Sequence, residues 1–303
     1  METVPQRVWR WQIAAYLFLA GAGAGAFLVG VAGLRLGHVL AGQIGMTLGV
    51  PVVAGSTLFL ILDLGTPAKF MAAILHPGTS WISRGFVILS GLIIFGGLLV
   101  ALSVWPFGGV LTPADTAYKL LEVLAFVCAL ATCIYTGILI GVVVSRPFWN
   151  NPLLPFLFLL SALSTGIGGV FLVTPIASAV LGLRNASTEF LTWADIVLVI
   201  TEAIAVYLYL TVVADRAPES VYLLVRGRLA GMFWGGFLIA GLALPALIEY
   251  AAATQPAVSQ TAAMLVAGAL LLVGGFLLRL LILAAGIRTP LVARAEFRVR
   301  PGI

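Results

Sequence analysis

Apolar residues are gathered along this chain into eight long segments, which are separated by short polar connectors. A helix needs about 20 mostly apolar residues to cross the hydrocarbon core of a bilayer, so each segment predicts one membrane-spanning helix. The predicted spans are Trp11–Leu34, Val39–Leu64, Arg84–Trp105, Leu120–Val144, Leu153–Leu181, Trp193–Val213, Leu229–Tyr250 and Val258–Gly286. The expected fold class is therefore all-α, a polytopic membrane bundle of eight transmembrane helices that forms one domain over residues 1–303.

Composition excludes a water-soluble protein. Hydrophobic residues make up 62% of the 303 residues and charged residues only 9%, far from the balance of soluble domains. The connectors are too short to hold an inserted soluble domain. The first apolar segment is longer than the core of a signal peptide, so we interpret it as a retained helix. Residues 1–10 and 287–303 are predicted to be polar tails, and the second tail is basic.

Histidine is missing from every apolar segment, because the sequence has only His38 and His76 and both lie between segments. A membrane-embedded haem needs imidazole ligands inside the helices, usually in pairs. Cys128 and Cys133 are five residues apart on different faces of one predicted helix, so neither a disulfide nor a metal cluster is expected there. The sequence also lacks CxxC, HExxH, a phosphate-binding loop and a dinucleotide-binding glycine motif. We therefore expect no haem and no metal in this chain.

Basic residues are concentrated on one side of the predicted bundle. An even number of spans puts both termini on that side, which carries twelve Lys and Arg against three on the opposite side. The twelve are Arg7, Arg10, Lys69, Arg84, Arg146, Arg216, Arg226, Arg228, Arg288, Arg294, Arg298 and Arg300. The positive-inside rule then places both termini in the cytoplasm of a prokaryotic cell, with the protein in its inner membrane. A surface that docks a partner protein would collect arginines in the same way.

The net charge of +5 does not indicate a nucleic acid partner. The basic residues lie at helix ends, where they serve as topology signals and contact the headgroups of membrane lipid.

The connectors after the second and fourth spans contain an unusual number of polar and aromatic residues. Prolines in both connectors predict sharp, rigid turns, which suit a docking surface or the rim of a pocket. We expect Asp63, His76 and Arg84 near a pocket mouth. The residues expected to dock a partner are Lys69, Trp81, Arg146, Trp149 and Asn150. The alternative is that the Trp and Arg side chains only anchor helix ends at the membrane interface.

Small residues and phenols distinguish the first and fourth spans. Gly21 and Gly25 form a small-xxx-small face, which allows either close helix packing or contact with a flat ligand. Tyr16 and Tyr135 lie at similar depths, about 8–14 Å from the terminus-bearing side at 1.5 Å per residue. A buried phenol needs a hydrogen-bond partner. The two tyrosines either donate to the carbonyl oxygens of a quinone, or bond to backbone groups or to each other.

Charged residues inside the second half of the bundle suggest a further role. Asp195 and Glu202 are seven residues apart and so share a helix face, and Arg279 lies in the last span. Charges are costly in lipid, so we expect them to face the bundle interior and to find partners. A Glu202–Arg279 ion pair follows, acting either as a structural link or as a step in a proton path. Glu122 and Glu249 lie nearer the opposite surface and are weaker candidates for the far end of such a path.

Four stretches resemble the NrfD/PsrC family, the membrane subunit of polysulfide reductase and related molybdopterin oxidoreductase complexes. They are YLFLAGAGAGAFL, DLGTPAKF, HPGTSWISRG and YTGILIGVVVSRPFWNNPLLPFLFLLSALSTG, which begin at Tyr16, Asp63, His76 and Tyr135. The resemblance covers the first to the fifth span in the same order as in the family. The tyrosine followed by SRPFWN is its most specific part, and the second half matches mainly by helix count.

The resemblance implies a haem-free subunit that exchanges electrons between menaquinone or ubiquinone and a four-cluster iron–sulfur subunit. That subunit would serve a molybdopterin catalytic subunit, so this chain would not itself act on the terminal substrate. The family quinone pocket lies between the first and fourth spans, and Tyr135 matches its quinone-contacting tyrosine. The polysulfide reductase subunit uses a histidine and an asparagine on the first span, where this sequence has Tyr16 and Ile13. Catalytic subunits lie outside the cytoplasm in that family member, in tension with the charge distribution here.

The function expected from the sequence is therefore that of a quinone-reactive membrane subunit of an oxidoreductase complex in the respiratory chain. Residues 11–144 would form the half with the quinone site, and residues 153–286 the half with the proton path. A secondary transporter is the main alternative, since Glu202, Arg279 and Pro51 inside a predicted span also suit one. A passive anchor without quinone chemistry is a third reading.

Overall fold

The computed structural model describes residues 11–64, 80–181 and 188–288. Their helices, in order along the sequence, are α1 (Trp11–Arg35), α2 (Val39–Leu64), α4 (Trp81–Gly91), η1 (Leu92–Gly96), α5 (Gly97–Ser103), α6 (Thr116–Gly141), α7 (Leu153–Leu181), α8 (Glu189–Ala214), α9 (Pro218–Val225), η2 (Met232–Ala243), α10 (Leu244–Thr254) and α11 (Gln260–Ala285). No strand occurs within these described ranges. The all-α class expected from the sequence is confirmed.

The eight predicted spans are confirmed, because eight helical stretches of the described residues are long and apolar enough to cross a membrane. Two of them combine several elements. The third span runs through α4, η1 and α5, and the seventh runs through η2 and α10; η1 and η2 have the wider π-helical hydrogen-bond pattern. The short helix α9 between the sixth and seventh spans was not foreseen, because it is amphipathic and too short to register as an apolar segment.

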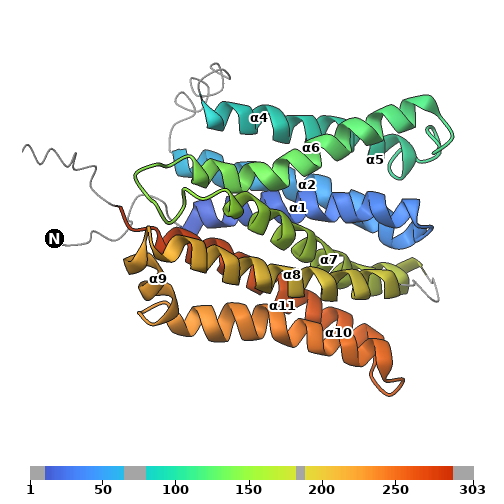
Figure 1. Ribbon diagram of the computed structural model, residues 1–303. Helices are drawn as coiled ribbons and strands as arrows, with labels where there is room; N and C mark the ends of the chain where they lie inside the picture. Colours follow the sequence, from blue (N-terminus) through green and yellow to red (C-terminus); the bar gives the residue numbers. More distant parts are fainter. Residues whose placement is uncertain (1–10, 65–79, 182–187, 289–303) are drawn as a thin grey trace, which may run out of the picture.

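The spans lie alongside one another in a single bundle (Figure 1). The helices α1 and α7 run through its middle, the α4–α5 span lies along one edge, and η2 with α10 lies along the other. We call the end where α1 begins and α11 ends the terminal face, and the end that carries the α10–α11 turn the far face. Because consecutive spans run in opposite directions, α6 and α8 also end at the terminal face.

Glycine allows α1 to become the centre of the bundle. A Cβ atom on Gly23 would lie 2.8 Å from the Gly49 carbonyl oxygen of α2, and one on Gly25 would overlap the Ala162 carbonyl group of α7. Side chains at these positions would force the helices apart, so close backbone packing depends on glycine. Most residues of α1 are consequently buried, as is expected of a helix that has no polar face.

The helix α2 runs without interruption through Pro51, which is exposed on its surface. Pro51, which the sequence offered in favour of a transporter, therefore does not break this helix.

Candidate functional site

Tyr16 and Tyr135 meet near the terminal face. Both side chains are almost fully buried, at 1% and 2% exposure, and the two phenol groups are close enough to share a hydrogen bond. The sequence left open whether these phenols would reach a ligand, the backbone or one another. The structure brings the two side chains together, so their hydroxyl groups lie next to each other.

A glycine on α4 makes room for this pair. A Cβ atom on Gly85 would overlap the ring and hydroxyl of Tyr135, so the phenol lies directly against the α4 backbone. The preceding residue, Arg84, is exposed, and its guanidinium lies 4.6 Å from the centre of the Trp81 ring. The Tyr pair is thus enclosed by α1, α4 and α6, with a cation on the surface beside it.

The surface beside Gly21 is occupied by protein. A Cβ atom there would lie 3.1 Å from Nη2 of Arg279 and 3.5 Å from the Ala162 side chain. Gly21 therefore takes part in close helix packing beside a buried arginine, one of the two roles that the sequence left open for it. Cys133 of α6 is fully buried on the same level, with its sulfur 4.0 Å from the Gly21 carbonyl oxygen.

Arg279 and Glu202 are linked by a serine. Arg279 is fully buried and donates from Nη1 to the Ser161 hydroxyl at 2.6 Å and to the Gly275 carbonyl at 2.9 Å. Ser161 also lies beside the Glu202 carboxylate, which is 1% exposed. The two charges therefore interact across Ser161 instead of through the direct ion pair that the sequence suggested. The guanidinium also faces the Phe158 ring, 5.2 Å from its centre, which favours a buried cation.

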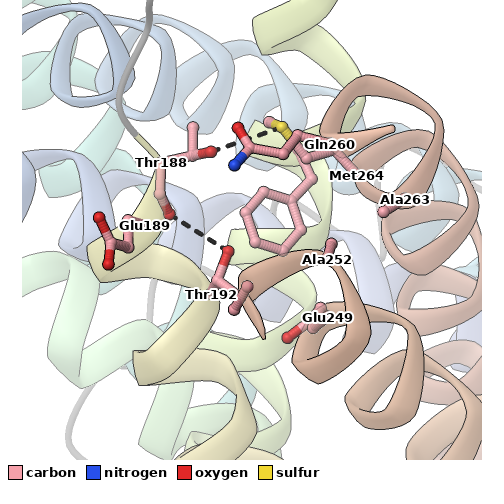
Figure 2. A pocket seen from close by; sticks show the side chains of 10 residues that line it. Thr188, Glu189, Thr192, Glu249, Ala252, Gln260, Ala263 and Met264 are labelled. Atoms are coloured by element: carbon pink, nitrogen blue, oxygen red, sulfur yellow. Dashed lines mark hydrogen bonds between the residues drawn. The ribbon is translucent and has the colours of Figure 1, made fainter. Parts of the chain in front are cut away.

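Asp195 continues this polar line toward the far face. It lies on the same face of α8 as Glu202, is fully buried, and has Ser164 of α7 and Glu249 of α10 beside its carboxylate. Glu249 in turn lines a cavity of about 340 Å³ at the far face (Figure 2). Glu122, the other acidic candidate, is instead paired with Arg35 of α1.

The connector between α6 and α7 is fixed from inside. Trp149 is fully buried and its indole N–H donates to the Ile282 carbonyl oxygen at 2.7 Å, while Tyr209 donates to the Phe148 carbonyl oxygen. Arg146 donates to the Gly286 carbonyl oxygen. Burial and the nearby charge of Arg288 hold the pKa of Arg146 below its usual value.

These contacts bear on the residues predicted to dock a partner. Arg146 and Trp149 are buried and hold the connector against α11, so they do not present surface to a partner. Asn150 is exposed, as a docking residue must be, and it donates to the Gly141 carbonyl oxygen at 2.6 Å. Trp81 is half-buried. Lys69, His76 and the Asp63 side chain lie outside the described residues.

The sequence as a whole matches a family of known proteins. The family described as "Polysulphide reductase, NrfD" matches residues 1–291, which is nearly the whole sequence. The chain belongs to the NrfD family. Membership places it among the membrane subunits of oxidoreductase complexes, as a multi-pass protein of the bacterial inner membrane.

Individual NrfD-type proteins match over similar lengths. The C subunit of polysulfide reductase from Wolinella succinogenes is 29% identical over 304 residues, which cover 92% of this chain and 94% of that protein. Protein NrfD of Escherichia coli K12 is 31% identical over 321 residues, covering 92% of this chain and 95% of that one. The NrfD homologue of Haemophilus influenzae is 29% identical over 311 residues, covering 93% and 95%. Both halves of this NrfD-family chain therefore match these proteins. This includes the second half, which resembled the family mainly in its number of helices.

Sequence reasoning missed three residues of this site. Ser161 and Ser164 are three residues apart and lie on the α7 face toward the charged residues, but serine is ordinary in a membrane helix and gave no signal by itself. Gly85 directly follows Arg84. A side chain at position 85 would overlap the Tyr135 ring, which the sequence alone does not show.

Proposed function

We propose that this chain is the quinone-reactive membrane subunit of its complex, and that Tyr16 and Tyr135 hold the quinone headgroup. The convergence of these two phenols at the terminal face supports the proposal. A phenol can donate one hydrogen bond and accept another. Two adjacent phenols can therefore bind one quinone carbonyl oxygen, or bond to each other when the quinone is absent.

A bare stretch of backbone and a cation lie beside the pair. Gly85 keeps the α4 backbone bare beside Tyr135, and the exposed Arg84 supplies positive charge at the surface nearby. We propose that Arg84, together with Asp63 and His76 from outside the described residues, forms the mouth of the quinone site.

Electrons would pass between the quinone and an iron–sulfur subunit docked on the terminal face. That subunit would carry four clusters and serve a molybdopterin catalytic subunit. Of the predicted docking residues, Asn150 and Trp81 have side chains at least partly accessible at this face, and Lys69 would complete the surface. The excess of basic residues supports a cytoplasmic position of the terminal face.

Proton movement is the second part of the proposal. Asp195, Glu202, Ser161 and Arg279 form a buried polar line that runs from near the far face to the level of Gly21, just inside the Tyr pair. Ionisable groups inside a membrane bundle are costly, and where they occur they typically mark an ion or proton pathway. Quinone reduction takes up protons and quinol oxidation releases them, and this line would carry them.

The test is Tyr135→Phe in the intact complex. Loss of one hydrogen bond to the headgroup is expected to lower quinol-linked turnover about tenfold, corresponding to about 1.4 kcal/mol. Sensitivity to a quinone-site inhibitor should fall in parallel. The matched control is Tyr250→Phe, because Tyr250 is exposed at the other end of the bundle and only its ring touches Trp193. Unchanged turnover and inhibitor sensitivity in Tyr135→Phe would remove this residue from the site.

A further inference from the structure

A pair of buried carboxyl groups lies at the inner end of the far-face cavity. The cavity is bounded by α7 and by the ends of α8, α10 and α11, and polar side chains such as Thr188, Thr192 and Gln260 line it (Figure 2). Glu249 projects from α10 to its wall although only 3% of the residue is exposed. Asp195 of α8 lies immediately beside Glu249 and is fully buried.

The pair is poorly supplied with hydrogen-bond donors in the described part of the chain. Both carboxyl oxygens of Asp195 and both of Glu249 are buried and accept no hydrogen bond there, although the Ser164 hydroxyl approaches Asp195. A buried carboxylate without a donor or a cation is strongly disfavoured. Two carboxylates side by side cannot both be ionised, so at least one proton must reside on the pair.

Neighbouring charges strengthen this conclusion. Glu202 is the next acidic residue on the same face of α8, so this face of the helix adds a carboxyl group and no cation. Glu189 lies exposed at the cavity mouth. The cavity-lining residues from α7 and α11 are all neutral, namely Phe171, Gln260, Ala263 and Met264. Among the residues that line the cavity, none is therefore a cation that could neutralise the pair.

We propose that Asp195 and Glu249 form a proton-binding site, which exchanges its proton with water on the far side through this cavity. A volume of about 340 Å³ holds several water molecules, each of which occupies about 30 Å³ in the liquid. A hydronium ion gives its proton to the pair and remains as water, so no group is oxidised or reduced. Proton binding at this site stands by itself; its use as the outer end of the Glu202–Arg279 line rests on the proposed function.

The test uses dicyclohexylcarbodiimide on the complex in native membranes at neutral pH. A protonated carboxyl group in apolar surroundings adds to this reagent and rearranges to a stable N-acylurea, which peptide mass spectrometry locates. We expect the adduct on Glu249. Labelling of that peptide should fall at least tenfold in Glu249→Gln and several-fold in Asp195→Asn. The matched control, Glu189→Gln, removes an exposed carboxylate from the same cavity and should leave labelling of Glu249 unchanged.

Several results would overturn the proposal. Absence of an adduct on Glu249 in the unmodified complex would show that no proton is held there. Protection from labelling by sodium chloride, but not by potassium chloride, would show that the pair binds a metal cation instead. Full labelling of Glu249 in Asp195→Asn would show that the two groups act separately.

A second measurement does not depend on the variants folding. The unmodified complex should show a carboxylic acid C=O infrared band that shifts in D₂O, and the carbodiimide should remove it. A missing band would contradict the proposal. Neither measurement requires quinone turnover, so failure of the proposed quinone function would leave both results unchanged.

Discussion

The phenol groups of Tyr16 on α1 and Tyr135 on α6 face each other, although they come from spans that are distant in the sequence. Each hydroxyl is therefore the nearest candidate partner of the other, and a ligand between α1 and α6 would meet both. This relationship makes the two residues energetically dependent on each other, and that dependence can be measured.

Removing both hydroxyls should cost less than the sum of the single losses. We expect Tyr16→Phe and Tyr135→Phe each to lower quinol turnover about tenfold, and the double variant to lower it by clearly less than a hundredfold. Residues that contact the same group typically show coupling of about 0.5–3 kcal/mol. A double-mutant cycle on turnover by the intact complex measures this coupling. Strictly multiplicative losses would mean that the two phenols act on separate groups.

Filling the space at Gly85 should reproduce the loss of the Tyr135 hydroxyl. In Gly85→Ala the new methyl group would overlap the Tyr135 ring and displace it from Tyr16. Turnover should fall about as far as in Tyr135→Phe, by an order of magnitude. The control is Gly97→Ala on the same span, where the added Cβ would have ordinary contact with Val50 at 3.8 Å. Equal activity of the two glycine variants would contradict the expected role of the α4 backbone.

Ser161→Ala should destabilise the bundle. It removes the acceptor 2.6 Å from Nη1 of Arg279 and leaves a buried guanidinium with fewer partners, at a cost of about 1–3 kcal/mol. Thermal unfolding of the detergent-solubilised protein measures the change. Ser178→Ala on the same helix is the control, because its hydroxyl is buried and has no hydrogen-bond partner among the described residues, so its removal should be neutral or stabilising. A Ser161 variant as stable as the Ser178 variant would show that the arginine does not depend on this bond.

The connector between α6 and α7 should depend on its buried indole. Trp149→Phe removes the 2.7 Å bond to the Ile282 carbonyl oxygen and should lower stability by about 1–2 kcal/mol. Trp234→Phe removes a similar bond to the Val225 carbonyl oxygen, but that indole is 49% exposed, so water replaces the bond at little cost. Thermal unfolding of both variants is the measurement, and equal losses would refute the effect of burial.

Much of the fold follows from the sequence because lipid imposes a simple rule. Every backbone N–H and C=O group in a bilayer needs a hydrogen-bond partner. A single long apolar segment can provide these partners itself only by forming a helix. Two spans agree with the prediction at both ends, Val39–Leu64 and Leu153–Leu181. The π-helical turns of η1 and η2 were not predicted, because they depend on how neighbouring helices pack and not on hydrophobicity.

The site was predicted less completely. The pairing of Tyr16 with Tyr135 was one of the alternatives open at the sequence level, since depth along a helix can be counted but rotation around it cannot. The sequence suggested a direct contact between Glu202 and Arg279 because charges attract. It could not show that Ser161 lies between them, since that requires the packing of α7. Trp149 was expected at a surface because tryptophan is common at membrane interfaces, whereas here its ring fills the space above Gly286.

The glycine contacts of α1 have a consequence for biogenesis. Among the described spans α1 comes first in the sequence, yet one of its main packing partners, α7, belongs to the fifth. Until Ala162 and Gly166 of α7 have been synthesised, Gly25 and Ala26 lack their packing partners, and that side of α1 is not covered by a helix. A nascent polypeptide that stops before α7 would therefore remain an open, unfinished assembly and a natural target for membrane quality control.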